Sequence, residues 1–261
     1  RSKKIHVIGA QHGCVYGDSY EPWHFDSDFK RCDSFISYGF IKDDLEALYP
    51  GVKFKTDILP LGKSKIIKQK SKTKQIDILF PIAKSTSMLV DGMIRTPPEK
   101  LVERQIKILE YLNSIEGISV YVKPFMHSGP RNCAVFSVLK RLKNLKVVNN
   151  MTLSAFLMEY SARAVIIEFP SQPLFEVLHL NTEIFLMDDC MHPYSDIALE
   201  ELKKRVYYTC DIAQMISNLS LFLKGGLLNK RDDTFFNHYV RKNNSREDIL
   251  KLISDLTKRS K

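Results

Sequence analysis

The stretch Ile76-Asp77-Ile78-Leu79-Phe80-Pro81 decides the fold class. It is a short and nearly continuous apolar run, which is typical of a strand buried on both faces of a parallel sheet. After it, Pro97-Pro98 opens a helix whose apolar residues recur at helical spacing, and Gly117 ends that helix. The run Ile118–Val122 then predicts the next strand. Strand, helix and strand in this order form the repeating unit of an α/β domain.

The same alternation continues along the chain. It predicts a doubly wound, parallel, Rossmann-like sheet of five to seven strands over residues 75–225, with helices on both faces. Two more helices are predicted in the C-terminal tail. The predicted helices are 134–143, 153–162, 172–180, 195–205, 211–223, 233–241 and 245–259, and the predicted strands are 145–148, 163–169, 183–187 and 207–209.

The N-terminal part of the chain has its own pattern. A strand over 4–8 precedes a glycine-rich loop, and Asp33–Phe40 predicts a second strand that ends at a glycine. The run 63–74 carries six lysines and no acid, which is typical of a connecting segment. We therefore expect four parts: an N-terminal α/β portion, a basic linker, a second α/β domain, and C-terminal helices. Their predicted ranges are 1–62, 63–74, 75–225 and 226–261.

The net charge of +9 is concentrated in a few segments. Residues 1–4, the lysine run and residues 224–261 together carry more than the whole of it, so the folded body is mildly acidic. Such a distribution favours contact with an anionic membrane over a duplex-binding face, and we expect no nucleic-acid partner. The alternative is a solvated linker and tail without a partner.

The five cysteines are scattered and form no CxxC pair. This pattern gives no metal-site spacing and indicates reduced thiols in the cytoplasm. No stretch approaches the ~20 apolar residues that a membrane span needs. We therefore expect a cytoplasmic location, peripheral to the inner membrane if the basic segments bind it. Because the chain begins at Arg1, with its first strand within four residues, we also expect it to be the C-terminal part of a longer protein.

The loop Gly9–Asp18 follows the first predicted strand and contains three glycines, His12 and an acid. Glycine permits unusual backbone angles and close approach to a ligand. Ligands of open α/β sheets bind beyond the carboxyl ends of the strands, where this loop would lie. The loop matches neither the P-loop nor the dinucleotide fingerprint. A surface turn is the alternative to a binding loop.

Two further loops leave strand ends in the second domain. Lys123–Arg131 supplies two cations, a histidine and a hydroxyl, a combination suited to phosphate oxygens, although a structural turn would explain it too. Ser171 is a natural N-cap, and the same position presents backbone N–H groups to an anion. Glu176, one turn later, would bind ribose hydroxyls or complement the helix dipole. We interpret Asp188–Pro193 as a rim loop without metal-site spacing.

On these residues the chain resembles bacterial surface-carbohydrate transferases of lipopolysaccharide and capsule clusters, which are GT-B-type glycosyltransferases. The similarity lies in the QHG loop, the DSFISYG strand and the downstream EFPSQPLFEVLHLNTEIFLMD segment. CMP-sugar-dependent relatives, which use donors similar to Kdo or sialic acid, carry signature pairs where this chain has Lys123-Pro124 and Ser171-Gln172. The resemblance implies metal-independent transfer from a nucleotide-sugar, with a CMP-sugar favoured. It implies no cofactor beyond this co-substrate, and a carbohydrate or lipid-linked glycan as acceptor. It also implies that residues 1–62 are the end of an acceptor-side domain that is mostly missing here, that 75–225 is the donor-binding domain, and that the helices of 226–261 pack back.

The chemistry of such transfer assigns roles to individual residues. A base must deprotonate the acceptor hydroxyl, and cations or helix dipoles must stabilise the departing phosphate. His12 is our first candidate for the base because imidazole exchanges protons near neutral pH, and it would otherwise contact the donor phosphate. Asp18 and Glu21 are the other candidates for the base. The predicted donor-binding residues are Gly13, Lys123, Pro124, His127, Ser128, Ser171, Gln172 and Glu176.

Two other classes of function remain open at this point. A nucleotide-sugar epimerase or hydrolase on the same architecture would bind the donor without an acceptor. A catalytically inert module would bind a nucleotide or glycan and localise a partner enzyme.

Overall fold

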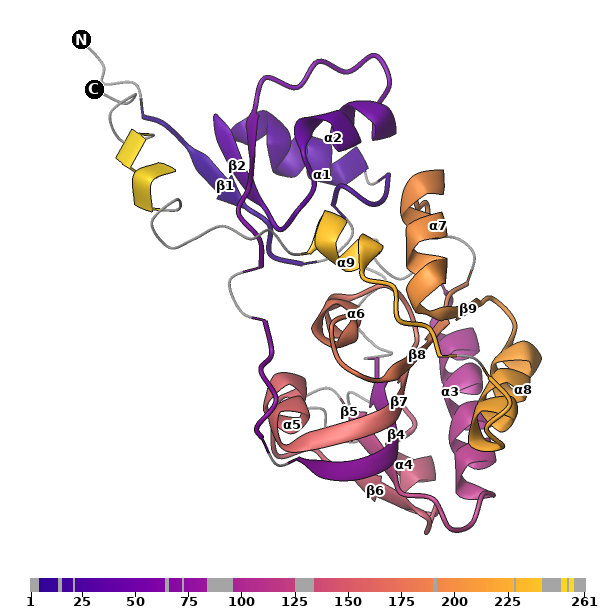
Figure 1. Ribbon diagram of the computed structural model, residues 1–261. Coiled ribbons are helices and arrows are strands. Elements are labelled where there is room, and N and C mark those ends of the chain that lie inside the picture. The colour runs from indigo at the N-terminus through magenta and orange to yellow at the C-terminus, as the bar shows by residue number, and fades with distance from the viewer. Residues whose placement is uncertain are drawn as a thin grey trace. The chain divides into compact units, whose positions relative to one another are not determined.

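The computed structural model describes residues 5–13, 16–20, 22–63, 66–71, 73–83, 96–124, 134–189, 192–227, 229–240, 250–252 and 254–255. The chain folds into two compact units (Figure 1). Unit 1 comprises residues 1–66, 193–202 and 232–261, and unit 2 comprises residues 67–192 and 203–231. This division differs from the predicted domain 75–225, because residues 193–202 belong to unit 1.

Unit 2 is built on a six-stranded sheet in which every strand pair is parallel. The strands lie in the order β6-β5-β4-β7-β8-β9. The chain begins the sheet at the central strand β4, adds β5 and β6 on one side, and then adds β7, β8 and β9 on the other. This confirms the predicted doubly wound sheet. The strands are β4 (Lys74–Ile82), β5 (Val120–Pro124), β6 (Leu145–Val147), β7 (Tyr160–Ile167), β8 (Glu183–Met187) and β9 (Tyr207–Thr209).

Apolar burial on both faces explains why these strands lie in the middle of the unit. All five residues of β8 are buried, and β4 and β7 carry buried side chains on both faces. Figure 1 shows α3 and α8 side by side on one face of the sheet and α5 and α6 on the other. The helices of unit 2 are α3 (Pro98–Asn113), α4 (Phe136–Leu139), α5 (Leu153–Glu159), α6 (Gln172–Val177) and α8 (Ile212–Leu223), and α7 (Asp196–Arg205) enters it with its last residues.

Several predicted boundaries need correction. Helix 153–162 is shorter because the chain enters β7 at Tyr160, where β-branched and aromatic residues favour the strand. Helix 134–143 is reduced to the single turn of α4. The lysine run is not a free linker along its whole length, because unit 2 begins at Ile67. The Ile67 side chain is 6% exposed, and Lys70 Nζ lies 3.1 Å from Glu159 Oε1.

Unit 1 contains a separate parallel sheet of three strands in the order β1-β2-β3. As expected, no described strand pairing continues from this sheet into the sheet of unit 2. The first strand lies later than predicted, so Gly9 and Ala10 pair with β2 instead of belonging to the loop. The elements are β1 (Ile8–Ala10), α1 (Pro22–Ser27), η1 (Phe29–Arg31), β2 (Ser34–Ser37), α2 (Lys42–Leu48), β3 (Asp57–Pro60) and α9 (Thr234–Tyr239).

Helix α9 packs within unit 1 through buried aromatic side chains. Phe235 is fully buried, and Tyr239 is 3% exposed. The His238 ring connects two other elements of the unit: its Nε2 lies 3.1 Å from Asp44 Oδ1, and its Nδ1 lies 3.1 Å from Glu201 Oε2. Hydrogen bonding to Asp44 is the largest cause that raises the pKa of His238, and burial opposes it. The predicted helix 245–259 falls mostly outside the described residues.

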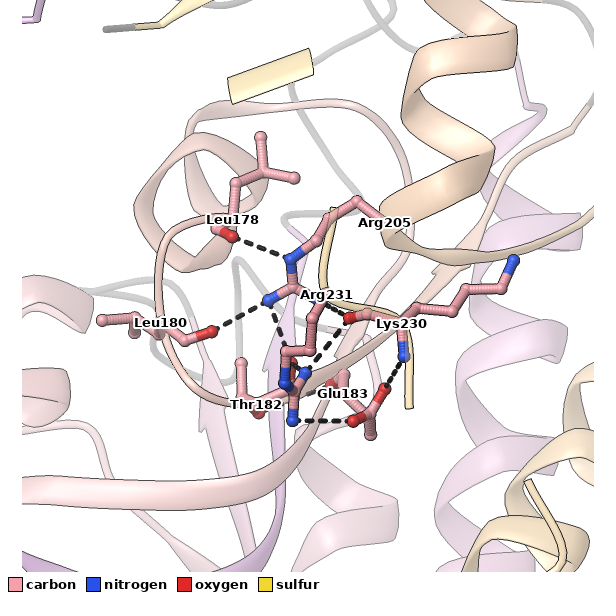
Figure 2. A network of polar contacts seen from close by, with 7 residues as sticks. All are labelled: Leu178, Leu180, Thr182, Glu183, Arg205, Lys230 and Arg231. Carbon is pink, nitrogen blue, oxygen red and sulfur yellow. Dashed lines mark hydrogen bonds and ion pairs between the residues drawn. The ribbon is translucent and has the colours of Figure 1, made fainter. Parts of the chain in front are cut away.

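A buried arginine fastens the end of unit 2 (Figure 2). The Arg205 side chain, 1% exposed, donates hydrogen bonds to the carbonyl oxygens of Leu178, Leu180, Thr182 and Lys230, at 2.9 to 3.0 Å. Beside it, Arg231 pairs with Glu183 at 2.7 Å, and the Lys230 N–H donates to the same carboxylate. This cluster, which we call the Arg205 network, ties the loop between α6 and β8 to residues 230–231 (Figure 2).

Two of the five cysteines have a defined redox state, and one of them differs from the prediction. Cys32 is a free thiol whose pKa is raised by burial. Cys210, directly after β9, is disulfide-bonded. The expectation of reduced cysteines is therefore wrong for Cys210.

Candidate functional site

The carboxyl edge of the unit 2 sheet collects the charged side chains that are candidates for a binding site. Lys123 lies at the end of β5, Glu168 directly follows β7, and Asp188 directly follows β8. The sheet order reverses between β4 and β7, and ligands of doubly wound sheets bind in the crevice at such a switch point. The fold therefore places these side chains along the edge where a ligand is expected.

Glu168 is the most strongly perturbed acid at this edge. Its carboxyl group is buried, and its Oε2 accepts hydrogen bonds from the Ala83 N–H at 2.7 Å and from Gln105 Nε2 at 3.0 Å. Arg104 donates to the Glu168 carbonyl oxygen. Burial raises the pKa of Glu168 to about 7, although these hydrogen bonds and the Arg104 charge oppose the shift. Among the described residues, Glu168 Oε1 has no hydrogen-bond partner.

Lys123 and Glu176 were predicted to bind a donor from two different loops, and the structure brings their charges together. Lys123 is 4% exposed, and its Nζ donates to the Pro124 carbonyl at 3.2 Å. Burial lowers the pKa of Lys123, whereas the Glu176 carboxylate opposes this shift. Glu176 Oε2 is buried without a hydrogen-bond partner in the described part of the chain. The pair thus combines a cation with an anion, and Glu176 Oε2 can still accept a hydrogen bond from a ligand.

The start of α6 forms the neighbouring part of the edge. Ser171 occupies the N-cap position with extended backbone angles, but its hydroxyl makes no capping hydrogen bond. Gln172 is the first helical residue, and its Oε1 is buried without a hydrogen-bond partner among the described atoms. Pro124 ends β5, where it pairs in register with Ile82 of β4. These three predicted residues therefore lie at the ends of elements that border the switch point.

Asp188 extends the acidic edge along β8. Burial raises its pKa to about 6, and the neighbouring Asp189 carboxylate adds to the shift. The Tyr208 hydroxyl and the Asp189 N–H each donate to the Asp188 carboxylate at 2.7 Å. Within the residues that the structure describes, no group of three or more His, Cys, Asp or Glu side chains has the geometry of a metal site.

The glycine loop of unit 1 is held by Gln11, whose side chain is 7% exposed. Its Oε1 accepts from the Tyr38 N–H at 2.7 Å, and its Nε2 donates to the Gly13 carbonyl at 2.8 Å. Between these anchors, His12 is exposed and Gly13 has open space where a Cβ would lie. The loop therefore presents an imidazole and a bare backbone segment to its surroundings.

Gly9 and Gly17, the other two glycines of the predicted loop, have a different role from the one predicted. A Cβ on Gly17 would lie 2.2 Å from Phe40, and one on Gly9 would lie 2.8 Å from Phe35. Neither glycine has a positive φ. They are needed for packing against the aromatic core of unit 1, and not for approach to a ligand or for an unusual backbone conformation.

The three predicted base candidates have different surroundings. His12 is exposed, whereas Asp18 is only 2% exposed and its carbonyl accepts from the Ser195 N–H. A base must reach the hydroxyl of an acceptor, so exposure favours His12. Glu21 lies outside the described residues, as do His127 and Ser128 of the predicted phosphate loop.

Sequence reasoning missed Glu168, Arg104, Gln105 and Asp188 as site residues. Glu168 and Asp188 had a usable signal, because each is an acid that directly follows a run of four apolar residues at the end of a strand, 164–167 and 184–187. Arg104 and Gln105 had no such signal. They lie within the amphipathic helix α3, where their residue types alone would indicate a solvated face.

The raised pKa of Glu168 predicts a pH-dependent stability. Between about pH 4.5 and about pH 7 the unfolded chain releases this proton while the folded chain keeps it, so the free energy of unfolding falls as the pH rises. Above about pH 7 this contribution is constant. In the wild type, Glu168 should lower the free energy of unfolding by about 3 kcal/mol across this pH range, and Glu168→Gln should abolish that decrease. Urea denaturation at a series of pH values measures it. Glu110→Gln, an exposed control on α3, should keep the wild-type slope, and equal slopes for Glu168→Gln and wild type would contradict the assignment.

Two α/β units, each built on a parallel sheet, are typical of the GT-B class of fold. The sequence model of the LIC12162 family transferases matches residues 1–189, and the chain belongs to this transferase family. No curated protein is similar enough in sequence to count as a match.

Solved structures confirm the fold class. The chain is similar to TarM of S. aureus (10% identity, TM-score 0.52, 97% of this chain and 50% of TarM). It is also similar to the pneumococcal O-GlcNAc transferase GtfA, solved with UDP and GlcNAc (13% identity, TM-score 0.55, 97% of this chain and 52% of GtfA). A third similar structure is that of a Listeria monocytogenes protein assigned as a UDP-N-acetylglucosamine 2-epimerase (13% identity, TM-score 0.52, 93% of this chain and 67% of that protein). The chain spans about half the length of TarM and GtfA.

Proposed function

We propose that this protein is a glycosyltransferase that moves a sugar from a nucleotide-sugar donor to a glycan acceptor. The observation that carries the proposal is the grouping of Lys123, Glu176 and Glu168 along the carboxyl edge at the switch point. Membership of a transferase family supports it, as does the likeness of the fold to TarM and GtfA.

Each charged side chain at this edge would bind a particular group of a nucleotide-sugar. The Lys123 ammonium would stabilise the phosphate that departs with the nucleotide, and its burial strengthens that interaction. Glu176 and Glu168 have carboxyl oxygens left without hydrogen-bond partners among the described residues, and such oxygens accept from sugar or ribose hydroxyls. Lys123 would supply the positive charge at the leaving group, so we propose transfer without a bound metal and without a further cofactor.

The donor nucleotide is the finer part of the proposal. The resemblance to surface-carbohydrate transferases favours a CMP-sugar, although Lys123-Pro124 and Ser171-Gln172 depart from the commonest form of the CMP-sugar signature pairs. GtfA, by contrast, was solved with UDP. Titration calorimetry with CMP and UDP, on the same preparation, separates these two donors. Tighter binding of UDP would replace the CMP-sugar in the proposal.

The acceptor is proposed to be a surface polysaccharide or its lipid-linked precursor. The basic run at 63–74 and the basic tail would hold the protein on an anionic membrane surface, where such precursors lie. Within the described part of the chain, no helix has both the length and the apolar composition to cross a bilayer. Sedimentation with anionic and with neutral vesicles tests the proposed contact.

The deciding experiment is product analysis with CMP- and UDP-sugars, with and without a lipid-linked glycan acceptor. Glycosylated product that requires the acceptor supports transfer. A changed sugar nucleotide in the absence of acceptor would instead favour the epimerase reaction, for which the similarity to the Listeria protein is the specific observation. Nucleotide binding without any turnover would favour an inert binding module.

The Lys123→Ala variant should bind the nucleotide about 10- to 100-fold more weakly, because a charge-assisted phosphate contact contributes roughly 1.5–3 kcal/mol. Calorimetric titration with the nucleotide diphosphate or monophosphate measures this change. Lys146→Ala, an exposed lysine on the adjacent strand β6, is the matched control and should bind normally. Unchanged affinity in a folded Lys123→Ala protein would remove Lys123 from the donor site.

A further inference from the structure

We infer that Tyr16 and Asp28 are positioning residues that fix the tautomer of His12, with a proton on Nδ1 and a free electron pair on Nε2. The inference rests on the proposed function in so far as His12 is the base of that reaction. It adds two residues that sequence reasoning did not select, and it assigns each nitrogen of the ring a separate role.

A short chain of hydrogen bonds carries the inference. The Tyr16 hydroxyl donates to Asp28 Oδ2 at 3.0 Å, and its oxygen lies 2.8 Å from His12 Nδ1. A phenol has a single proton, and that proton is used in the bond to the carboxylate. The Tyr16 oxygen can therefore only accept from His12, so Nδ1 must carry the hydrogen. In a neutral imidazole the other nitrogen, Nε2, is then the acceptor.

The surroundings of Tyr16 keep this hydroxyl in one place. Tyr16 is 2% exposed, and its ring stacks on the buried His24 ring, with centroids 3.9 Å apart and planes 10° apart. The next residue, Gly17, packs so closely on Phe40 that a side chain would not fit. A buried ring with neighbours on its face cannot turn its hydroxyl away without disrupting the core. The tyrosine thus forms a rigid support for an exposed imidazole.

The fixed tautomer suits a base. As the acceptor oxygen bonds to the anomeric carbon, its proton moves to His12 Nε2. The bond from that carbon to the donor phosphate oxygen breaks, and its electron pair leaves with the phosphate. His12 is then an imidazolium with hydrogens on both nitrogens. The Tyr16 oxygen accepts from Nδ1–H in both states, and the Asp28 carboxylate behind it stabilises the positive charge. No side chain in this series of hydrogen bonds has to rearrange during the step.

Nitrogen-15 NMR of the histidine-labelled full chain tests the inference without any assay of activity. The chain has seven histidines, and the signals missing in His12→Ala identify His12. Spectra are recorded at about pH 8.5, above the range in which histidine normally titrates. In the wild type we expect a protonated Nδ1 and an unprotonated Nε2. Tyr16→Phe, which keeps the buried ring, should lose this preference, whereas Tyr20→Phe, at an exposed tyrosine of the same segment, should keep it.

Asp28→Asn provides a second variant at a partly exposed position, so the test survives if Tyr16→Phe does not fold. It should also weaken the preference for Nδ1–H. A wild-type His12 protonated on Nε2, or an unchanged tautomer in both variants, would overturn the inference. Where transfer is measurable, Tyr16→Phe should lower kcat by about 10- to 100-fold with little effect on nucleotide affinity. Absence of transfer in the wild type would refute the proposed function, while the tautomer result would stand independently.

Discussion

His12→Ala is expected to lower turnover by about 10²–10⁴-fold, the usual contribution of general acid–base catalysis. The imidazole is exposed on a loop that Gln11 anchors on both sides, so its removal should leave the backbone of the loop in place. Nucleotide affinity should change much less than turnover. The measurement is a comparison of kcat, with acceptor present at saturation, and of the dissociation constant for the nucleotide.

The controls for this prediction separate three outcomes. His6→Ala removes another imidazole of unit 1, one that contacts Ser34 and lies outside the loop, and it should keep normal turnover. Asp18→Asn and Glu21→Gln, measured beside it, show whether an acid is the base instead. Normal turnover in His12→Ala would exclude the histidine from the mechanism. A loss confined to donor affinity would make it a phosphate ligand.

Arg205→Ala should cost about 4 kcal/mol of folding free energy. The side chain is buried and donates to four carbonyl oxygens, and the truncation removes all four hydrogen bonds (Figure 2). The oxygens of Leu180, Thr182 and Lys230 keep a second donor, from the Thr182 N–H or from the Arg231 side chain. A hydrogen bond from a charged group contributes about 1.5–3 kcal/mol, and the expected loss stays below the sum of four such bonds because three of the oxygens keep a second donor. At roughly 2–4 °C per kcal/mol for a chain of this size, Tm should fall by about 10 °C.

Arg163→Ala is the matched control for this variant. Arg163 pairs with Asp77 at 3.0 Å on the surface, where its side chain is 53% exposed, and a surface pair contributes less than about 1 kcal/mol. Arg205→Lys adds a second comparison, because lysine keeps the charge but lacks the planar set of donors that reaches several carbonyls. Equal stability of Arg205→Ala and Arg163→Ala would show that the Arg205 network does not contribute to folding.

Apolar burial explains which parts of the fold could be predicted from the sequence. Strands β4, β7 and β8 are buried on both faces, so their residues form nearly continuous apolar runs that are visible without a structure. Helices α1 and α2 are short and rich in polar or aromatic residues, and no long periodic pattern marks them. An acid at the third helical position is a local signal for a helix start, and Asp44 Oδ2 accepts from the Ile41 N–H at the start of α2. A search for apolar periodicity does not detect this signal.

The candidate site shows the same limit. The sequence selects Lys123 and Glu176 as candidates because Lys123 lies near the end of a clear strand and Glu176 lies in the helix that follows another, and their roles stay predictions. Arg205 could not, because it is the third base of Lys203-Lys204-Arg205 in the last turn of α7, where bases normally complement the helix dipole in solvent. Only the packing of the loop between α6 and β8 shows that the third base is buried. Likewise, nothing in the sequence marks Tyr16 as the residue that holds His12.

The division of the chain into interleaved segments has a consequence for its synthesis. Unit 1 takes residues from the beginning, the middle and the end of the chain, whereas unit 2 is complete once Arg231 has been made. Phe235 and Tyr239, which are buried in unit 1, leave the ribosome after every residue of unit 2. The unit whose translation starts first is therefore the last that can close its core. During synthesis, the aromatic residues of the first segment of unit 1 stay exposed until residues 232–261 have been made, so chaperone dependence should be greatest for unit 1.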